Sequence, residues 1–283
     1  MNNPISFFTS TPAAIRLELV MVRGSAPREE GTVMYVSAER IEGSIGGGRL
    51  EFIAIEAARD MLKAGSFERR LEVPLGPEIG QCCGGYVAIA MDFLDAIELR
   101  AEEARRETER STQPAVYIFG SGHVGRALAD SFALLPVQVT LVDEREDELA
   151  LCRAPVRHCL TPLPEAEVRA APAGSAFIIL THDHALDFII TAEALMRSDA
   201  AYVGMIGSNT KRASFERWCR KSSAPVGRTE RLVCPIGAQG SGDKRPEVIA
   251  AFVAAEVIAR LTPACGPVDP QLELLGSGGQ FHE

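Results

Sequence analysis

The sequence predicts an α/β fold, in which a C-terminal Rossmann-like doubly wound parallel sheet is preceded by a smaller α+β domain. After Pro114, short continuous apolar runs alternate with apolar helical stretches, which is typical of strands buried on both faces of a parallel sheet. A glycine-rich turn, Gly-Ser-Gly-His-Val-Gly, follows the first of these runs. Ahead of Pro114, residues 99–113 are almost entirely charged or polar and divide the chain into two parts.

The N-terminal part reads as a small mixed domain over residues 1–98, followed by 99–113 as a charged, solvated helical linker. A helix is expected at 49–64, where apolar side chains recur at helical spacing. The expected strands are apolar runs bounded by glycine and proline: 16–23, 31–37, 67–73 and 86–93.

The C-terminal part is expected to form the Rossmann-like domain over residues 114–262, with 263–283 as a tail. A helix at 126–135 should follow the glycine-rich turn. The expected strands are continuous apolar runs: 116–119, 137–142, 176–180 and 202–206.

Composition excludes several classes of protein. The 283 residues carry a formal net charge of −9, which does not favour nucleic-acid binding. No apolar stretch reaches the length of a membrane span, and the N-terminus lacks the pattern of a signal peptide. Seven irregularly spaced cysteines fit a reducing compartment. We therefore expect a cytoplasmic protein that binds neither nucleic acid nor membrane.

The glycine-rich turn comprises Gly120, Gly122, His123 and Gly125, and Asp143 ends the next expected strand. Strand, turn, helix, strand and acid in this order form the fingerprint of dinucleotide binding. The first two glycines permit a tight turn and the close approach of a pyrophosphate, and the acid would bind a ribose hydroxyl. The alternative is a Rossmann-like sheet whose site is unused or serves another ligand.

A second glycine loop, Gly46-Gly47-Gly48, runs into the expected helix at 49–64. Its geometry suits an anion at the helix start, although it lacks the Gly-Lys-Ser/Thr ending of nucleotide-hydrolase phosphate loops. The alternative is a tight strand-to-helix turn without a ligand.

Two adjacent thiols, Cys82 and Cys83, lie directly before Gly84 and Gly85. Neighbouring cysteines rarely form an unstrained disulfide, and they lack the two-residue gap of a Cys-x-x-Cys metal hook. Glycine allows a ligand to approach closely. The pair therefore suggests a thiol contact with a ligand.

Two more candidates follow expected strands of the parallel sheet. His182 lies in Thr181-His182-Asp183-His184, and Asn209 ends the turn Gly204–Asn209. Ligands bind at the carboxyl ends of parallel strands, so both residues are candidates for ligand contact. The alternative is that Asp183 caps the next helix and the histidines bond locally. No third or fourth ligand stands out for a metal.

Taken together, these segments resemble the XdhC/CoxI family. The stretches that carry the resemblance are Gly43–Glu51, Leu75–Tyr86, Tyr117–Gly125, Thr181–Asp187, Tyr202–Lys211 and Val233–Ala259. The resemblance implies a homodimer that binds the molybdenum cofactor (molybdopterin), shields it and assists its sulfuration with a cysteine desulfurase. It also implies delivery of the cofactor to apo xanthine dehydrogenase.

Three functions are weighed on this basis. The first is a cofactor chaperone with no turnover of its own, hence no catalytic residues and no metal ligands. The second is an NAD(P)-dependent oxidoreductase, favoured by the fingerprint and Asp143. The third is a thiol-redox sensor using Cys82 and Cys83. The sequence leaves open which thiol contacts the cofactor, and whether the Rossmann glycines bind the pterin phosphate or a nucleotide.

Overall fold

The computed structural model describes residues 6–76, 84–222, 228–238, 240 and 242–262. The chain divides into two compact units, Met1–Glu109 and Arg110–Glu283, which are treated separately below. Among the helices of the described ranges, none has the length and apolar character needed to cross a membrane.

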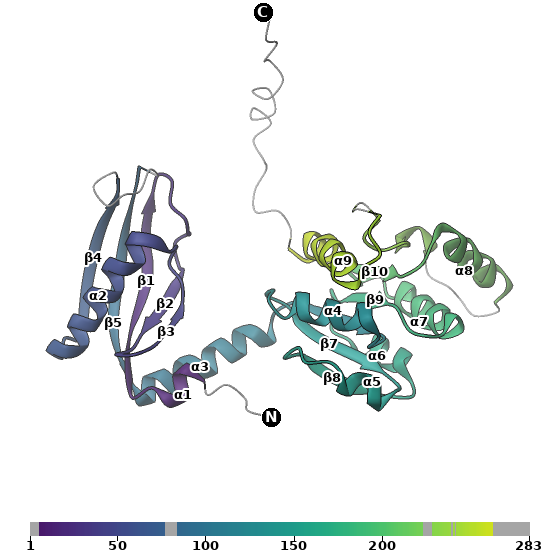
Figure 1. Ribbon diagram of the computed structural model, residues 1–283, viewed down its shortest axis with the longest axis horizontal. Helices are drawn as coiled ribbons and strands as arrows, with labels where there is room; N and C mark the ends of the chain where they lie inside the picture. Colours follow the sequence, from purple (N-terminus) through teal and green to yellow (C-terminus); the bar gives the residue numbers. More distant parts are fainter. Residues whose placement is uncertain (1–5, 77–83, 223–227, 239, 241, 263–283) are drawn as a thin grey trace, which may run out of the picture. The chain divides into compact units, whose positions relative to one another are not determined.

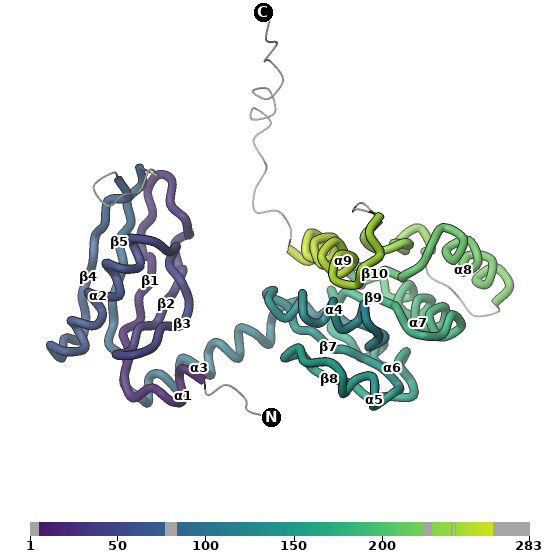
Figure 2. The backbone as a smooth tube through the Cα atoms, viewed as in Figure 1, coloured from purple at the N-terminus to yellow at the C-terminus, as the bar shows by residue number. Residues whose placement is uncertain are grey.

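The first unit is built on a five-stranded antiparallel sheet with the strand order β3-β2-β1-β5-β4. Its strands are β1 (Ala13–Arg23), β2 (Val33–Val36), β3 (Ile41–Gly43), β4 (Glu68–Leu75) and β5 (Gly85–Asp95). The long strands β1 and β5 run side by side through its middle (Figure 2). The short edge strand β3 was not expected, because its three residues contain only one large apolar side chain.

Helix α2 (Gly48–Ala64) covers one face of this sheet (Figure 1). Alternate residues of β1, such as Ile15 and Leu17, are fully buried in the core shared with the helix. From α2, Leu50 and Ala54 enter the same core, at the spacing that places them on one helical face. The predicted helix at 49–64 therefore forms with one additional residue at its start.

The opposite face of the sheet is covered by α1 (Phe7–Ser10) and by the start of α3 (Ala96–Ser111). Leu99 is fully buried there, together with Phe8 and Tyr35. The charged segment forms the expected helix, but it is not simply a solvated linker, because side chains from Leu99 to Arg106 contact the first unit. The division between the two units falls near its end, after Glu109.

The second unit contains a six-stranded parallel sheet with the order β11-β10-β9-β6-β7-β8, the doubly wound Rossmann arrangement. Its strands are β6 (Ala115–Phe119), β7 (Gln138–Asp143), β8 (Arg157–Leu160), β9 (Ala176–Ile179), β10 (Tyr202–Met205) and β11 (Leu232–Val233). Its helices are α4 (His123–Phe132), α5 (Glu146–Ala150), α6 (Pro164–Ala170), α7 (His184–Met196), α8 (Asn209–Lys221), η2 (Thr229–Arg231) and α9 (Pro246–Leu261). The predicted fold class is confirmed.

Helices cover both faces of this sheet. Side chains of α4 and α9 pack in one core with Val116 and Ile118 of β6. On the other face, α6, α7 and α8 share a core with Tyr117 and Phe119 of the same strand. Because β6 is buried on both faces, every position of its apolar run contacts a core, as the sequence predicted.

Candidate functional site

The loop between β6 and α4 holds the glycines of the fingerprint. Gly120 has a positive φ of 114°, and a Cβ there would lie 2.3 Å from the carbonyl oxygen of Leu180. A Cβ on Gly125 would lie 1.8 Å from the carbonyl oxygen of Gly120. At Gly122, in contrast, no atom lies within 4 Å of a built Cβ. Gly120 and Gly125 therefore serve the packing of the loop, whereas Gly122 borders open space.

The start of α4 suits an anion. The helix begins at His123, three residues earlier than expected, with Gly122 as its N-cap. No side chain caps this start, and its first turn contains no acidic residue. The helix dipole and the N–H groups of the first turn therefore favour a negatively charged group. His123 is exposed and lines a groove of about 320 Å³, whose charged lining comprises Arg126, Asp130 and Glu247.

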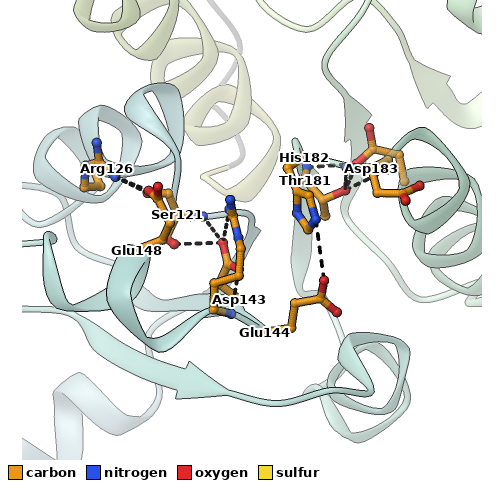
Figure 3. Close-up of polar contacts among 10 residues, drawn as sticks. Ser121, Arg126, Asp143, Glu144, Glu148, Thr181, His182 and Asp183 are labelled. Carbon is orange, nitrogen blue, oxygen red and sulfur yellow. Dashed lines mark hydrogen bonds and ion pairs between the residues drawn. The ribbon is translucent and has the colours of Figure 1, made fainter.

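Asp143 ends β7 and lies beside this loop, as the fingerprint requires, but its oxygens are engaged (Figure 3). Oδ2 accepts hydrogen bonds from Ser121 N (2.7 Å), Ser121 Oγ (2.7 Å) and Arg145 Nη2 (2.9 Å). Oδ1 accepts from Arg145 N and Arg145 Nε, both at 3.0 Å. A carboxylate offers about four lone-pair sites, so these donors saturate it. The side chain is 3% exposed.

This environment sets the charge state of Asp143. Burial raises the pKa of its carboxyl, but hydrogen bonds from Arg145 and Ser121 outweigh that effect and hold the pKa well below its ordinary value. The sequence pattern did not identify Ser121 or Arg145 as partners. On the other side of the loop, Arg126 Nη1 donates to Ser121 O at 2.6 Å and pairs with Glu148 at 2.7 Å. The glycine loop is thus fixed by two arginine–carboxylate pairs.

The turn after β9 is fixed by Asp187, which the sequence analysis did not identify. Asp187 Oδ1 accepts from Thr181 N (2.8 Å) and Thr181 Oγ1 (2.7 Å), and its side chain is 1% exposed. Its Oδ2 accepts from Lys211 Nζ at 2.5 Å, which joins α7 to α8. Asp183 caps α7, accepting from Ala185 N at 2.6 Å. The capping alternative considered for Asp183 is therefore observed.

His182 lies between these two anchored residues, and its side chain faces Glu144 (Figure 3). Its Nε2 is 3.6 Å from Glu144 Oε1, and both side chains are about 40% exposed. Asn209 is the exposed first residue of α8, after the next strand, β10. Within the described part of the chain, no group of three or more His, Cys, Asp or Glu is arranged to hold a metal ion.

In the first unit, the glycine loop at the start of α2 already contains an anion. Glu51 Oε1 accepts hydrogen bonds from Ser44 Oγ (2.5 Å), Ile45 N (3.1 Å) and Gly47 N (2.9 Å). Burial raises the pKa of the Glu51 carboxyl, but the hydrogen bonds from Ser44 and the loop backbone outweigh burial and lower the pKa overall. The anion position at the start of α2 is thus filled by the protein's own carboxylate, that of Glu51. Gly46 and Gly48 flank Gly47 in the same loop, both with positive φ.

The other glycine pair of this unit lies at the same end of the sheet. A Cβ on Gly85 would lie 2.2 Å from the carbonyl oxygen of Ser25, and Gly84 forms a parallel bridge with Ser25. A Cβ on Gly46 would lie 2.4 Å from Pro27 Cγ. The segment after β1 therefore contacts both glycine loops. Cys82 and Cys83, which directly precede Gly84, lie outside the described residues.

The two units define a class of protein: a Rossmann domain with a dinucleotide-type glycine loop, joined to an antiparallel sheet that has helices on both faces. Comparison with known proteins identifies the family. The XdhC Rossmann domain model matches residues 116–257, and the XdhC and CoxI family model matches residues 13–73. The chain belongs to the XdhC/CoxI family, which confirms the resemblance drawn from its motifs.

Among the proteins similar to this chain are a solved structure and a curated relative. A solved structure described as a xanthine dehydrogenase from Bacillus halodurans has a TM-score of 0.72 and 17% identity, over 94% of this chain and 96% of that one. At this identity the likeness shows the shared fold. The uncharacterized protein YqeB of Escherichia coli (strain K12) is 26% identical over 258 residues. Those residues cover 85% of this chain but only 42% of YqeB.

Proposed function

We propose that this protein is an accessory protein in the maturation of a xanthine dehydrogenase. In this role it binds the molybdenum cofactor, protects it, assists its sulfuration with a cysteine desulfurase and delivers it to the apo enzyme. Membership of the XdhC/CoxI family supports the accessory role. We further propose that it acts as a homodimer and performs no catalytic turnover.

The observation that carries the proposal is the saturation of Asp143. In the NAD(P)-dependent alternative, this carboxylate would accept hydrogen bonds from a ribose diol. Its two oxygens already accept two hydrogen bonds from Ser121 and three from Arg145. A ribose diol therefore has no acceptor at this position unless Arg145 leaves.

A ribose phosphate, as in NADP, fits no better at this position. The first turn of α5, which follows Arg145 directly, contains Glu146, Asp147 and Glu148. These carboxylates would repel a second phosphate, and the Arg145 guanidinium is already paired with Asp143. At the end of β7, the position where a dinucleotide's ribose would bind, the structure therefore disfavours both NAD and NADP.

The residues present nevertheless fit one phosphate group at the glycine loop. The open space at Gly122 and the uncapped start of α4 form a cradle that a side chain would fill. The N–H groups at Gly122 and His123 are the groups that would hold the phosphate of molybdopterin. When bound, the cofactor supplies the molybdenum centre on which xanthine oxidation depends; the chain's own residues bind, orient and shield it.

Delivery to a target enzyme tests the proposal. Protein loaded with molybdenum cofactor is mixed with apo xanthine dehydrogenase, a cysteine desulfurase and cysteine, and xanthine oxidation is followed. Activity should rise in proportion to the cofactor supplied and stop when it is exhausted. Free cofactor at equal concentration, and protein carrying Gly122→Val, serve as controls and should deliver less. Repeated hydride transfer to NAD by this protein alone would overturn the proposal and favour the oxidoreductase.

A further inference from the structure

The contact between Glu144 and His182 crosses the glycine loop. In the sheet, β6 lies between β7 and β9, so the loop after β6 emerges between the ends of its two neighbours. Glu144 directly follows β7, and His182 follows β9. A contact between these side chains therefore spans the strand that carries the glycine loop. Figure 3 shows the two side chains facing each other, with Ser121 and Asp143 beside them.

The backbone on both sides of this contact is firmly held. Thr181, directly before His182, is bound through its N–H and hydroxyl to Asp187, and Asp183 caps α7. Glu144 directly follows the saturated carboxylate of Asp143. Movement at this position therefore belongs to the side chains of Glu144 and His182, which are 38% and 44% exposed.

This contact is easier to separate than either of the two arginine–carboxylate pairs that fix the loop. Arg126 is 2.7 Å from Glu148, and Arg145 is 2.9 Å from Asp143. The Glu144–His182 contact is longer, at 3.6 Å, and both partners are more exposed. Exposed ion pairs contribute little free energy, because water and salt screen them.

We propose that Glu144 gates the glycine loop: its carboxylate holds His182 across the loop, and an anionic ligand binds by taking His182 in exchange. This inference rests on the proposed function, in which the loop receives the cofactor's phosphate. The Glu144 carboxylate opposes an approaching phosphate by like-charge repulsion, and the His182 imidazole can donate a hydrogen bond to either anion. Glu144 is thus a specificity-determining residue that slows entry and disfavours ligands too weakly anionic to displace it.

Binding kinetics of matched variants test the gate. The probes are isolated molybdenum cofactor under anaerobic conditions and, separately, inorganic phosphate. Glu144→Gln should raise the association rate of the cofactor about three- to fivefold, the range expected when one exposed carboxylate and its contact are lost. His182→Gln should lower affinity for both probes. In the double variant, the gain in rate from Glu144→Gln should fall to the small gain that Glu146→Gln gives, because only the charge repulsion is then removed. Glu146→Gln removes an equal charge from the exposed start of α5 and should change the rate less than about twofold.

The outcomes separate the gate from the carrier function. If wild-type protein binds cofactor and Glu144→Gln gains no more than Glu146→Gln, the gate is wrong and the carrier proposal stands. A gain larger than that of Glu146→Gln that persists without His182 also overturns the gate. If cofactor does not bind but phosphate binding shows the full Glu144 and His182 pattern, the gate stands and the carrier proposal fails. Absence of binding by both probes in every variant refutes the gate as well.

Discussion

Replacing Asp143 with asparagine should expose how much the second unit depends on this carboxylate. If the amide oxygen of the new side chain takes the place of Oδ2, it keeps the bonds from Ser121 N, Ser121 Oγ and Arg145 Nη2. The amide NH₂ then stands where Oδ1 accepted from Arg145 N and Nε, so donors face donors. The flipped amide is worse, because its NH₂ would face three donors.

The loss can be estimated from these contacts. Two donors of Arg145 lose their acceptor in a site where the replaced side chain was 3% exposed. Each buried donor left unpaired costs about 1–3 kcal/mol, and partial exposure of the Arg145 side chain moves the sum toward the lower end. We expect Asp143→Asn to reduce the free energy of unfolding of the second unit by about 2–3 kcal/mol.

Denaturation followed by tryptophan fluorescence measures this loss. Trp218, the single tryptophan of the chain, lies in α8, so its emission reports the second unit. Asp199→Asn is the matched control, because Asp199 forms the same two-point contact with Arg197, at 3.0 and 2.7 Å. The Asp199 side chain is 40% exposed, so water can replace what the control loses. Asp199→Asn should therefore reduce the free energy of unfolding far less than Asp143→Asn does.

The stabilisation should also depend on pH. The pKa of Asp143 is lowered on folding, so its contribution is present above the unfolded value near 4 and is lost as pH falls toward the folded value. The difference in the free energy of unfolding between wild type and Asp143→Asn should be constant from pH 7 to 5. It should shrink below about pH 4. A difference no larger than that of the Asp199 control, or one that does not change in acid, would refute the argument.

Three further sets of variants test other parts of the molecule. Gly122→Val should keep the circular dichroism and melting temperature of wild type but lose cofactor and phosphate binding. Gly125→Ala should lower the melting temperature, because its Cβ would lie 1.8 Å from a backbone oxygen. The reverse pattern would show that this loop does not bind the phosphate. Cys82→Ala or Cys83→Ala should lower the amount of molybdenum retained per protomer. Full molybdenum loading of both single variants and of the double variant would show that neither thiol contacts the cofactor. Glu51→Ala should destabilise the first unit by about 1–2 kcal/mol, as loss of a helix cap does, and an unchanged unfolding midpoint would contradict that role.

The strands and helices of the second unit could be predicted where burial governs the sequence. The runs at 116–119 and 176–180 are apolar because both faces of the sheet are covered, and they appear as β6 and β9. β8 (Arg157–Leu160) was missed, since it lies at a sheet edge and three of its four residues are exposed. α4 begins at His123 and not at 126, because the last glycine of the fingerprint packs inside its first turn.

The site was predictable in its backbone but not in its side-chain partners. The glycines signal where a chain must approach closely, and that requirement is local. The bonds that decide what the loops can bind join distant residues: Ser121 to Asp143, and Lys211 to Asp187. Glu51 is near its loop but occupies the fourth residue of α2, one position beyond that of a capping box. No spacing rule therefore pointed to it.

The carboxylate of Glu51 has a consequence for competition at the first glycine loop. It is tethered within a few residues of the N–H groups that it binds, so its effective concentration is on the order of millimolar or higher. A free phosphate ester present at micromolar levels would be outcompeted by this internal anion. The loop is accordingly ordered before any ligand arrives, so ligand binding carries no entropy cost for ordering it. A ligand of the first unit would then be recognised by groups other than the Gly46–Gly48 backbone, and the thiols Cys82 and Cys83 are the candidates that the sequence offers.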